Sequence, residues 1–469
     1  MTGDAASDEC ARATRVLAAW AAKVRYEDIP RPALERAVRV LADDLAAIVG
    51  ARGEPEVAAF HERTLARAKV AEATVFRGGR PRTDRLSAAV ANAVAADWLE
   101  LDEGYRPTPC HAGLYVVPAL LAECEARDVT LRDLLRALVV AYEIVTRVAR
   151  SWTARATLMQ SHGRYCAIAA AAAVALARNA DADLLRAAIT GAATLTMASP
   201  RDHLVSGALV RNVWPAVGAW AGSMGVEWAE CGIGGVDTAF FDVFSTVHGG
   251  TAHPQRLVES LGETWSILDG YMKLHACCQH LHSTVEALLE MRGRSDFDAG
   301  EIEEIVVEAH PLAFSLANPR PTTTLGAKFS LPHAVGAVIA TGTGGANAFT
   351  SATLADATIA RLRERVRVEP FTPLPDPPHD RPSRVRIAYR DGRKVAGECL
   401  SAQGGADRPF PQRVFIDKIT SLTSSVYPRF VPTFDALMRL DDRSLAQGWP
   451  ALVERICAPA CTSSQDSRR

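Results

Sequence analysis

Three histidines and two adjacent cysteines fall within one stretch of eleven residues, KLHACCQHLHS, residues 273–283. Imidazole titrates near neutral pH, so these histidines could move protons, or they could join the thiols around a metal ion. On a helix, His275, Cys278 and His282 would share one face. The paired CxxC or HxxxH pattern of structural zinc is missing, and neighbouring Cys277 and Cys278 point in different directions. We expect acid–base or substrate-binding histidines and no metal, with a loop of solvated histidines as the plain alternative.

A second cluster occupies WLELDEGYRPTPCHAG, residues 98–113. Glu100, Asp102 and Glu103 lie within four residues, and His111 follows across a loop that contains two prolines. Three such carboxylates could simply form a solvated helix end. Alternatively, one of them orients a histidine and raises its basicity, as in many acid–base sites.

The composition is that of a packed globular protein, with 48% apolar and 23% charged residues. At 469 residues the chain can form two or more domains. A net charge of −2 without a basic block excludes nucleic acid and anionic membranes as main partners. No apolar run approaches the length of a membrane helix, and the first residues lack a signal-peptide pattern. The ten cysteines have no framework spacing, so we expect reduced thiols and a cytoplasmic location.

The first half of the chain has the three- and four-residue apolar spacing of helices. Segments with this pattern are 14–50, 86–101, 113–126, 131–151, 166–180, 184–198 and 209–229. Several of them, above all AIAAAAAVALA, are apolar nearly all round and therefore buried.

The pattern changes after about residue 265. Residues 301–310 and 365–371 read as strands, and 383–400 as a hairpin around a DG turn. Helices are expected at 282–293 and 331–342. The sequence thus predicts a mainly α protein with an α+β insert: a helical domain from residues 1–265 and 405–469, and a smaller α+β domain from 266–404.

Five segments, in order along residues 14 to 440, resemble the MmgE/PrpD family, which includes 2-methylcitrate dehydratase, cis-aconitate decarboxylase and iminodisuccinate epimerase. The segments are RYEDIPRPALERAVRVLADDLAAIVG, ANAVAADWLELDEGYRPTPCHAG, GALVRNVWPA, KLHACCQHLHS and KFSLPHAVGAV. The resemblance implies a cleft between a helical domain and an α+β lid, a homodimer, and no metal or organic cofactor.

The resemblance also assigns residues to the cleft. Glu100 matches an acidic active-site position, His111 a loop histidine, Lys273 a lysine, and His280 and His282 the lid histidines. On this basis His111 is the leading general acid or base, with Glu100 or Asp102 holding its tautomer. His280 or His282 would handle a second proton transfer.

The sequence departs from the family pattern within the expected cleft. Arg211 replaces a lysine, Trp214 a histidine and Asp97 another histidine. We expect Arg211 and Lys273 to bind substrate carboxylates. Trp214 would add apolar contact area, and His162 would line the cleft.

These residues predict a lyase that transfers a proton next to a carboxylate of a small polycarboxylate-like acid, by dehydration or decarboxylation. An isomerase, epimerase or cyclase with the same acid–base cleft is the alternative. A non-catalytic scaffold is a third, remote alternative.

Overall fold

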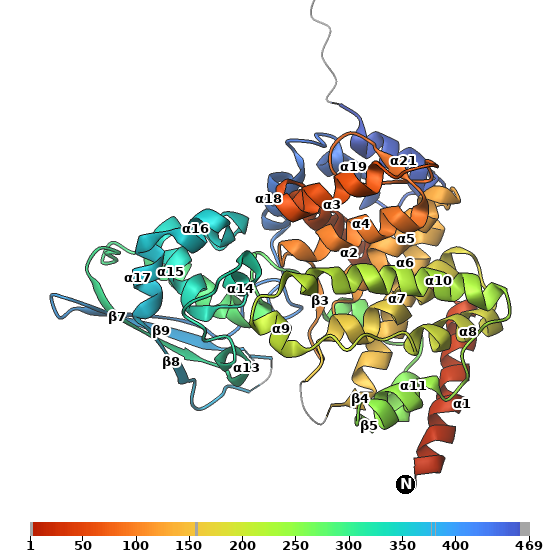
Figure 1. The fold of residues 1–469 in the computed structure, drawn as a ribbon, viewed down its shortest axis with the longest axis horizontal. Helices are drawn as coiled ribbons and strands as arrows, with labels where there is room; N and C mark the ends of the chain where they lie inside the picture. The colour runs from red at the N-terminus through yellow and green to blue at the C-terminus, as the bar shows by residue number, and fades with distance from the viewer. Residues whose placement is uncertain (1–2, 155–157, 377, 380, 460–469) are drawn as a thin grey trace, which may run out of the picture.

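The computed structural model describes residues 3–154, 158–376, 378–379 and 381–459. It is mainly helical with a smaller α+β part, which confirms the fold class predicted from the sequence (Figure 1). The exact division at residues 266 and 404 stays a prediction.

The helical domain contains the first eleven helices and the last four. They are α1 (Gly3–Lys23), α2 (Arg31–Gly50), α3 (Pro55–Leu65), α4 (Arg85–Trp98), α5 (Ala112–Ala126), α6 (Leu131–Arg150), α7 (Ser161–Ala177), α8 (Ala182–Ala193), α9 (Arg201–Val205), α10 (Trp214–Glu230), α11 (Ala239–Phe241), α18 (Gln412–Thr423), α19 (Phe430–Leu437), α20 (Asp442–Leu445) and α21 (Trp449–Cys457).

The alanine-rich helix α7 is the centre of this domain. It packs against α5, α6, α8 and α10, and its residues 165–177 are all buried. Small side chains let α10 approach it closely, because a Cβ at Gly222 would lie 2.4 Å from the Ala167 carbonyl oxygen. The predicted all-round apolar helix is thus the core of the domain.

The C-terminal helices return to the helical domain. In Figure 1 the blue helices α18, α19 and α21 lie beside the orange helices α2 and α3, whereas α1 lies at the opposite end of the domain. Helix α18 packs on α2, and Lys418 donates to Asp43 Oδ1 at 2.6 Å and to the Leu101 carbonyl at 2.9 Å. The C-terminal helices therefore hold the loop that follows α4.

The α+β domain is built on a four-stranded sheet in the order β10-β9-β7-β8. Its strands are β7 (Ile302–Ala309), β8 (Val366–Pro370), β9 (Ser383–Tyr389) and β10 (Lys394–Cys399), with β7 and β8 parallel and the other pairs antiparallel. The helices are α12 (His282–Arg292), α13 (Pro311–Phe314), α14 (Thr324–Lys328), α15 (Leu331–Thr341), α16 (Ser351–Ala355) and α17 (Ala357–Glu364). The predicted strands, the hairpin and both predicted helices are confirmed.

Three short strand pairs tie distant segments together: β1 (Ala73–Thr74) with β2 (Arg82–Thr83), β3 (Gly104–Tyr105) with β6 (Gly270–Tyr271), and β4 (Trp152–Thr153) with β5 (Thr251–Ala252). The β3–β6 pair brings the loop after α4 against the start of the α+β region. Gly104 is needed there, because a Cβ would lie 2.5 Å from the Tyr271 hydroxyl. Among the described residues no helix combines the length and apolarity that a membrane span requires.

Candidate active site

A cavity of about 350 Å³ lies between the helical domain and the α+β domain. The helical domain contributes the loop between α4 and α5, the segment before α7, α9 and the turn η3 (Leu209–Val213). The α+β region contributes residues 271–280, α13, Phe329 and Arg381. The lining residues include three arginines, one lysine, two histidines and one carboxylate, so the cavity suits an anion.

The loop after α4 presents the acidic residues. Helix α4 ends at Trp98, and Glu100 takes a left-handed backbone φ of 53° just past the helix cap, where glycine is usual. A side chain in this conformation costs on the order of 1 kcal/mol. The carboxylate contacts offset this strain, because Glu100 accepts from Lys273 and pairs with Arg211.

Lys273 lies between two of these carboxylates. Its Nζ is 3.1 Å from Glu100 Oε2 and 3.0 Å from Asp102 Oδ1, and its side chain is buried. Burial alone would lower the pKa of Lys273, but Asp102 and Glu100 raise that pKa well above its ordinary value. Lys273 therefore supplies a fixed positive charge and is a poor proton donor at neutral pH.

His111 lies immediately before α5 and lines the cavity. Its Nδ1 is 2.6 Å from Asp102 Oδ2 and 3.1 Å from the Glu103 carbonyl oxygen. Burial would raise the pKa of Asp102, but Lys273 and His111 lower that pKa well below its ordinary value. An ionised Asp102 holds the proton on Nδ1, which leaves Nε2 of His111 to act on a substrate.

Arg211 extends the row of charges on the other side of Glu100. Its guanidinium is 2.5 Å from Asp97 Oδ1 and also pairs with Glu100. Burial would lower the pKa of Arg211, but Asp97 and Glu100 raise it. Burial raises the pKa of Asp97 to about 6, although Arg211 acts in the opposite direction.

His162 closes this row into a ring. Its Nε2 is 3.1 Å from Asp97 Oδ2, and its imidazole meets that of His111 edge to face with centroids 5.0 Å apart. Its Nδ1 lies 2.9 Å from the Tyr115 hydroxyl, and burial lowers the pKa of His162 well below its ordinary value. We call the closed set the charge ring; its members are His111, Asp102, Lys273, Glu100, Arg211, Asp97 and His162.

The charge ring contains three carboxylates and two permanent cations. With its histidines neutral, the ring therefore carries a net charge of −1. The carboxylates, Arg211 and Lys273 are all buried. A proton taken up by His111 neutralises that net charge.

The same three carboxylates, Asp97, Glu100 and Asp102, are the one group in the described part of the chain whose potential metal-ligating atoms come within 4.8 Å of one another. Arg211 and Lys273 already bind them. An ion would have to displace these two cations, so the carboxylates do not fit a metal site.

Residues 273–283 do not form the helix that a shared metal-binding face would require. Most of them form a loop and a turn, η7 (Gln279–Leu281), and α12 begins only at His282. His282 Nε2 bonds to the Cys277 carbonyl oxygen at 3.1 Å, and the ring of His282 contacts that of His275. These histidines are buried or half-buried, so the alternative of a solvated loop is wrong.

The structure separates the two lid histidines. His280 lines the cavity, whereas His282 does not. Burial lowers the pKa of both rings well below the ordinary value, with a further lowering at His280 by Arg381. His280 is therefore a neutral imidazole that lines the cavity, whereas His282 bonds within its own loop.

Trp214 and His162 also lie outside the cavity lining. Trp214 is the buried first residue of α10, and His162 reaches the cavity through its contact with His111. The other predicted residues at this site, Glu100 and Arg211 among them, line the cavity or, like Asp102, lie directly behind His111.

Sequence reasoning did not find several lining residues. Arg201 and Arg381 lie in segments without a recognisable pattern, and Tyr271 precedes Lys273 by two positions. The guanidinium of Arg381 lies 5.5 Å from the centroid of the Tyr271 ring. The proline-rich loop that ends near Arg381 is the only sequence feature that could have drawn attention to it.

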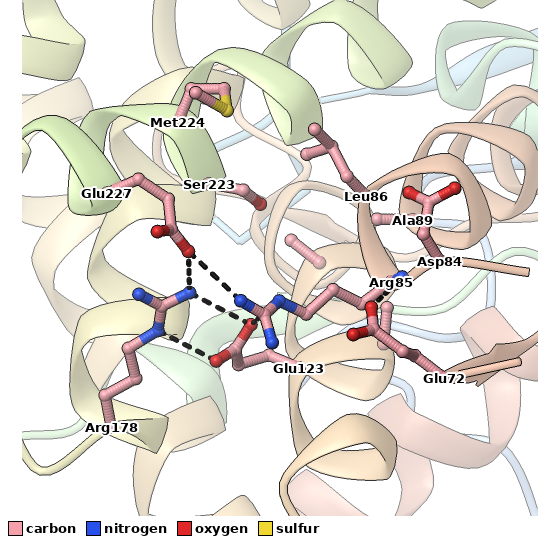
Figure 2. Close-up of a pocket in the computed structure, with 12 residues that line it drawn as sticks. Glu72, Asp84, Arg85, Leu86, Ala89, Glu123, Arg178, Ser223, Met224 and Glu227 are labelled. Atoms are coloured by element: carbon pink, nitrogen blue, oxygen red, sulfur yellow. Dashed lines mark hydrogen bonds and ion pairs between the residues drawn. The ribbon is translucent and has the colours of Figure 1, made fainter. Parts of the chain in front are cut away.

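A second cavity, of about 300 Å³, lies among α4, α5, α7 and α10. Figure 2 shows Arg85 and Arg178 between Glu123 and Glu227. Arg178 bonds to Glu123 at 2.8 Å and to Glu227 at 2.5 Å, and Arg85 bonds to the same two carboxylates at 3.3 and 3.2 Å. Because these charges satisfy one another, the cluster joins helices and has no group poised for chemistry.

The fold and the first cavity define a class of protein in which a helical and an α+β domain enclose an acid–base site. Residues 15–248 match the MmgE/PrpD N-terminal domain, and residues 275–430 match the MmgE/PrpD C-terminal domain. The chain belongs to the MmgE/PrpD family, which confirms the resemblance seen in its motifs.

Curated relatives come from two fungi. The chain is 24% identical to the cis-aconitate decarboxylase-like protein oryM of Aspergillus oryzae, over 95% of this chain and 96% of the relative. It is also 24% identical to a cis-aconitate decarboxylase of Aspergillus terreus, over 87% of this chain and 88% of the relative. Both alignments therefore cover both domains and the cavity between them.

Proposed function

We propose that this protein is a cofactor-independent lyase that transfers a proton at the carbon next to a carboxylate of a small polycarboxylate-like acid. Proton removal followed by loss of hydroxide gives dehydration. Loss of carbon dioxide followed by proton delivery gives decarboxylation. The observation that carries the proposal is the 2.6 Å contact between His111 Nδ1 and Asp102 beside the cavity.

His111 is the acid–base residue of this mechanism. As a base, Nε2 takes a proton from the substrate carbon, and Asp102 stabilises the resulting imidazolium through Nδ1. The excess negative charge of the ring falls to zero in that step. As an acid, the same imidazolium returns the proton to carbon or to the leaving hydroxide.

The substrate carboxylates need cations that lie outside the charge ring. Arg211 and Lys273 each contact two carboxylates of the protein, so their charge serves mainly to balance the ring. Arg201 and Arg381 line the cavity outside the ring, and we assign the substrate carboxylates to them. His280 lines the same cavity, and as a neutral imidazole it can hydrogen-bond the substrate.

The relatives support the lyase class, because two of them are named as cis-aconitate decarboxylases or decarboxylase-like. The low identity leaves the substrate and the outcome of the reaction as proposals. From the family resemblance we also propose a cytoplasmic homodimer. Light scattering should then give twice the 50.3 kDa of one chain.

Proton exchange in deuterium oxide tests the function. Wild type and His111→Gln are incubated with citrate-, aconitate- and succinate-type acids, and NMR follows deuterium incorporation and product formation. We expect exchange with turnover in wild type and a loss of about 10²- to 10⁴-fold in the variant, since that is the usual contribution of a general acid–base group. His253→Gln, outside the cavity, serves as the matched control.

Three results would change the proposal. Undiminished exchange in His111→Gln overturns the role of His111. Exchange without loss of water or carbon dioxide favours the isomerase, epimerase or cyclase alternative. If the protein neither binds any of these acids nor exchanges their protons, the result favours the scaffold.

A further inference from the structure

One part of the cavity lining is apolar. Five side chains form it: Met159, Leu204, Leu312, Leu316 and Phe329. They come from four separate regions, namely the segment before α7, α9, α13 with its following turn, and the residue after α14. We call them the apolar wall.

Most of the wall lies around one junction between the domains. Met159 pairs with Pro200 in an isolated β-bridge, directly beside Arg201. Arg201 in turn donates to Ser315 Oγ at 2.8 Å, next to Leu316. The side chains from the helical domain and from the α+β domain thus meet on either side of the Arg201–Ser315 bond.

Phe329 connects this junction to the charge ring. The guanidinium of Arg211 lies 5.4 Å from the centroid of the Phe329 ring, and Phe329 is buried. Leu204 and Leu316 are also buried, with exposed fractions of 6% and 1%. The wall is therefore part of the permanent lining and reaches from the ring to the junction at Arg201.

Exposed apolar residues continue the wall at the protein surface. Leu158 is 74% exposed, Leu312 51% and Phe314 37%. The Leu158 carbonyl accepts from the Arg201 backbone N–H at 2.8 Å, which fixes this residue beside the same junction. Exposed apolar side chains next in sequence to residues that line a cavity are consistent with a binding surface there.

A substrate made only of carboxylates and hydroxyls would leave the exposed part of this wall, above all Leu312, in contact with water. Each methylene moved from water onto such a surface contributes about 0.8 kcal/mol. Resting on the proposed function, we infer that the substrate is an acid that carries an aliphatic arm of several carbons. Its carboxylates lie with Arg201 and Arg381, and its arm lies along the apolar wall toward the mouth.

A series of 2-alkylsuccinates, from methyl to octyl, tests the arm by calorimetric binding. We expect the dissociation constant to fall about fourfold for each added methylene, which corresponds to about 0.8 kcal/mol. The decrease should stop once the arm is long enough to leave the cavity. Leu312→Ser, at a half-exposed position that should not affect folding, should flatten this slope. Leu204→Ala should flatten it further.

Ile233→Ser is the matched control, because Ile233 is a 67% exposed aliphatic residue outside the cavity. It should leave the slope unchanged. A dissociation constant independent of chain length overturns the arm but leaves the proposed function intact, provided that deuterium exchange still depends on His111. No binding of any member of the series, together with no exchange, overturns the proposed function and the arm with it.

Discussion

The guanidinium of Arg211 lies 2.5 Å from Asp97 Oδ1, although 114 residues separate them. These are two of the positions at which the sequence departs from its family pattern, with arginine in place of lysine and aspartate in place of histidine. The contact indicates that the two departures belong together. Arginine and lysine carry the same charge, so what Arg211 adds is a planar guanidinium that contacts Asp97 and Glu100 at once.

The pairing predicts strong coupling between the two positions. Asp97→His removes one carboxylate partner of Arg211, and Arg211→Lys replaces the guanidinium whose Nη1 contacts both Asp97 and Glu100. Each single change should lower the free energy of unfolding, by about 3 kcal/mol for the loss of the buried carboxylate. The double variant should recover 1 kcal/mol or more, the usual size of coupling between contacting residues. Urea unfolding of all four proteins measures this, and strictly additive losses would contradict it.

Replacing Asp102 should impair catalysis more than binding. Asp102→Asn keeps the shape of the side chain but removes the charge that holds the His111 tautomer and stabilises its imidazolium. We expect kcat to fall by about 10- to 100-fold, as for other residues that orient a reacting group, with KM changed less. The pH profile of kcat should shift as well, which a purely structural role would not cause.

The buried carboxyl of Glu103 should make the stability of the protein depend on pH. It accepts hydrogen bonds from the Gly113 N–H and the Tyr142 hydroxyl, and burial raises its pKa from 4.5 to about 7. The folded protein therefore binds this proton more tightly than the unfolded chain. The stability from this group is complete below pH about 4.5 and is lost as the pH rises through about 7.

Glu103→Gln cannot titrate, so its free energy of unfolding relative to wild type should rise by up to about 3 kcal/mol between pH 5 and pH 8. Urea unfolding at several pH values measures the difference. Glu62→Gln, on the exposed surface, should show no such trend. A relative stability that falls with pH would contradict the assignment.

The ion cluster of Figure 2 should affect stability alone. Arg178→Met leaves Glu123 and Glu227 short of a buried cation and should cost about 3–5 kcal/mol of unfolding free energy. Deuterium exchange by the folded variant should remain at the wild-type rate. Arg31→Met, which removes an exposed pair with Glu35, should cost less than about 1 kcal/mol.

Most of the fold could be predicted from local sequence. Apolar periodicity identified the helices, and β-branched alternation with a DG turn identified β7, β9 and β10. These signals are local because each element has one face that it must bury. The β3–β6 pair, two residues in each strand, has no such signal, since it depends on Gly104 meeting Tyr271 across more than 160 positions.

The candidate site was predictable only in part. His111, Glu100 and Lys273 stood out because they fall within motifs that the family shares. Sequence could not tell that Lys273 would bind carboxylates of the protein, because that depends on the distance between two segments 170 residues apart. For the same reason Arg201 and Arg381 carried no signal.

The contact of Lys418 with Asp43 and the Leu101 carbonyl has a consequence for how the protein is made. Asp43 and Leu101 precede Lys418 by 375 and 317 residues, so their buried cation comes only with α18. A nascent chain that stops before residue 412 already contains every member of the charge ring. It would nevertheless leave Asp43 without that cation and the loop before Asp102 without its tether, so the site matures only after α18 has been synthesised.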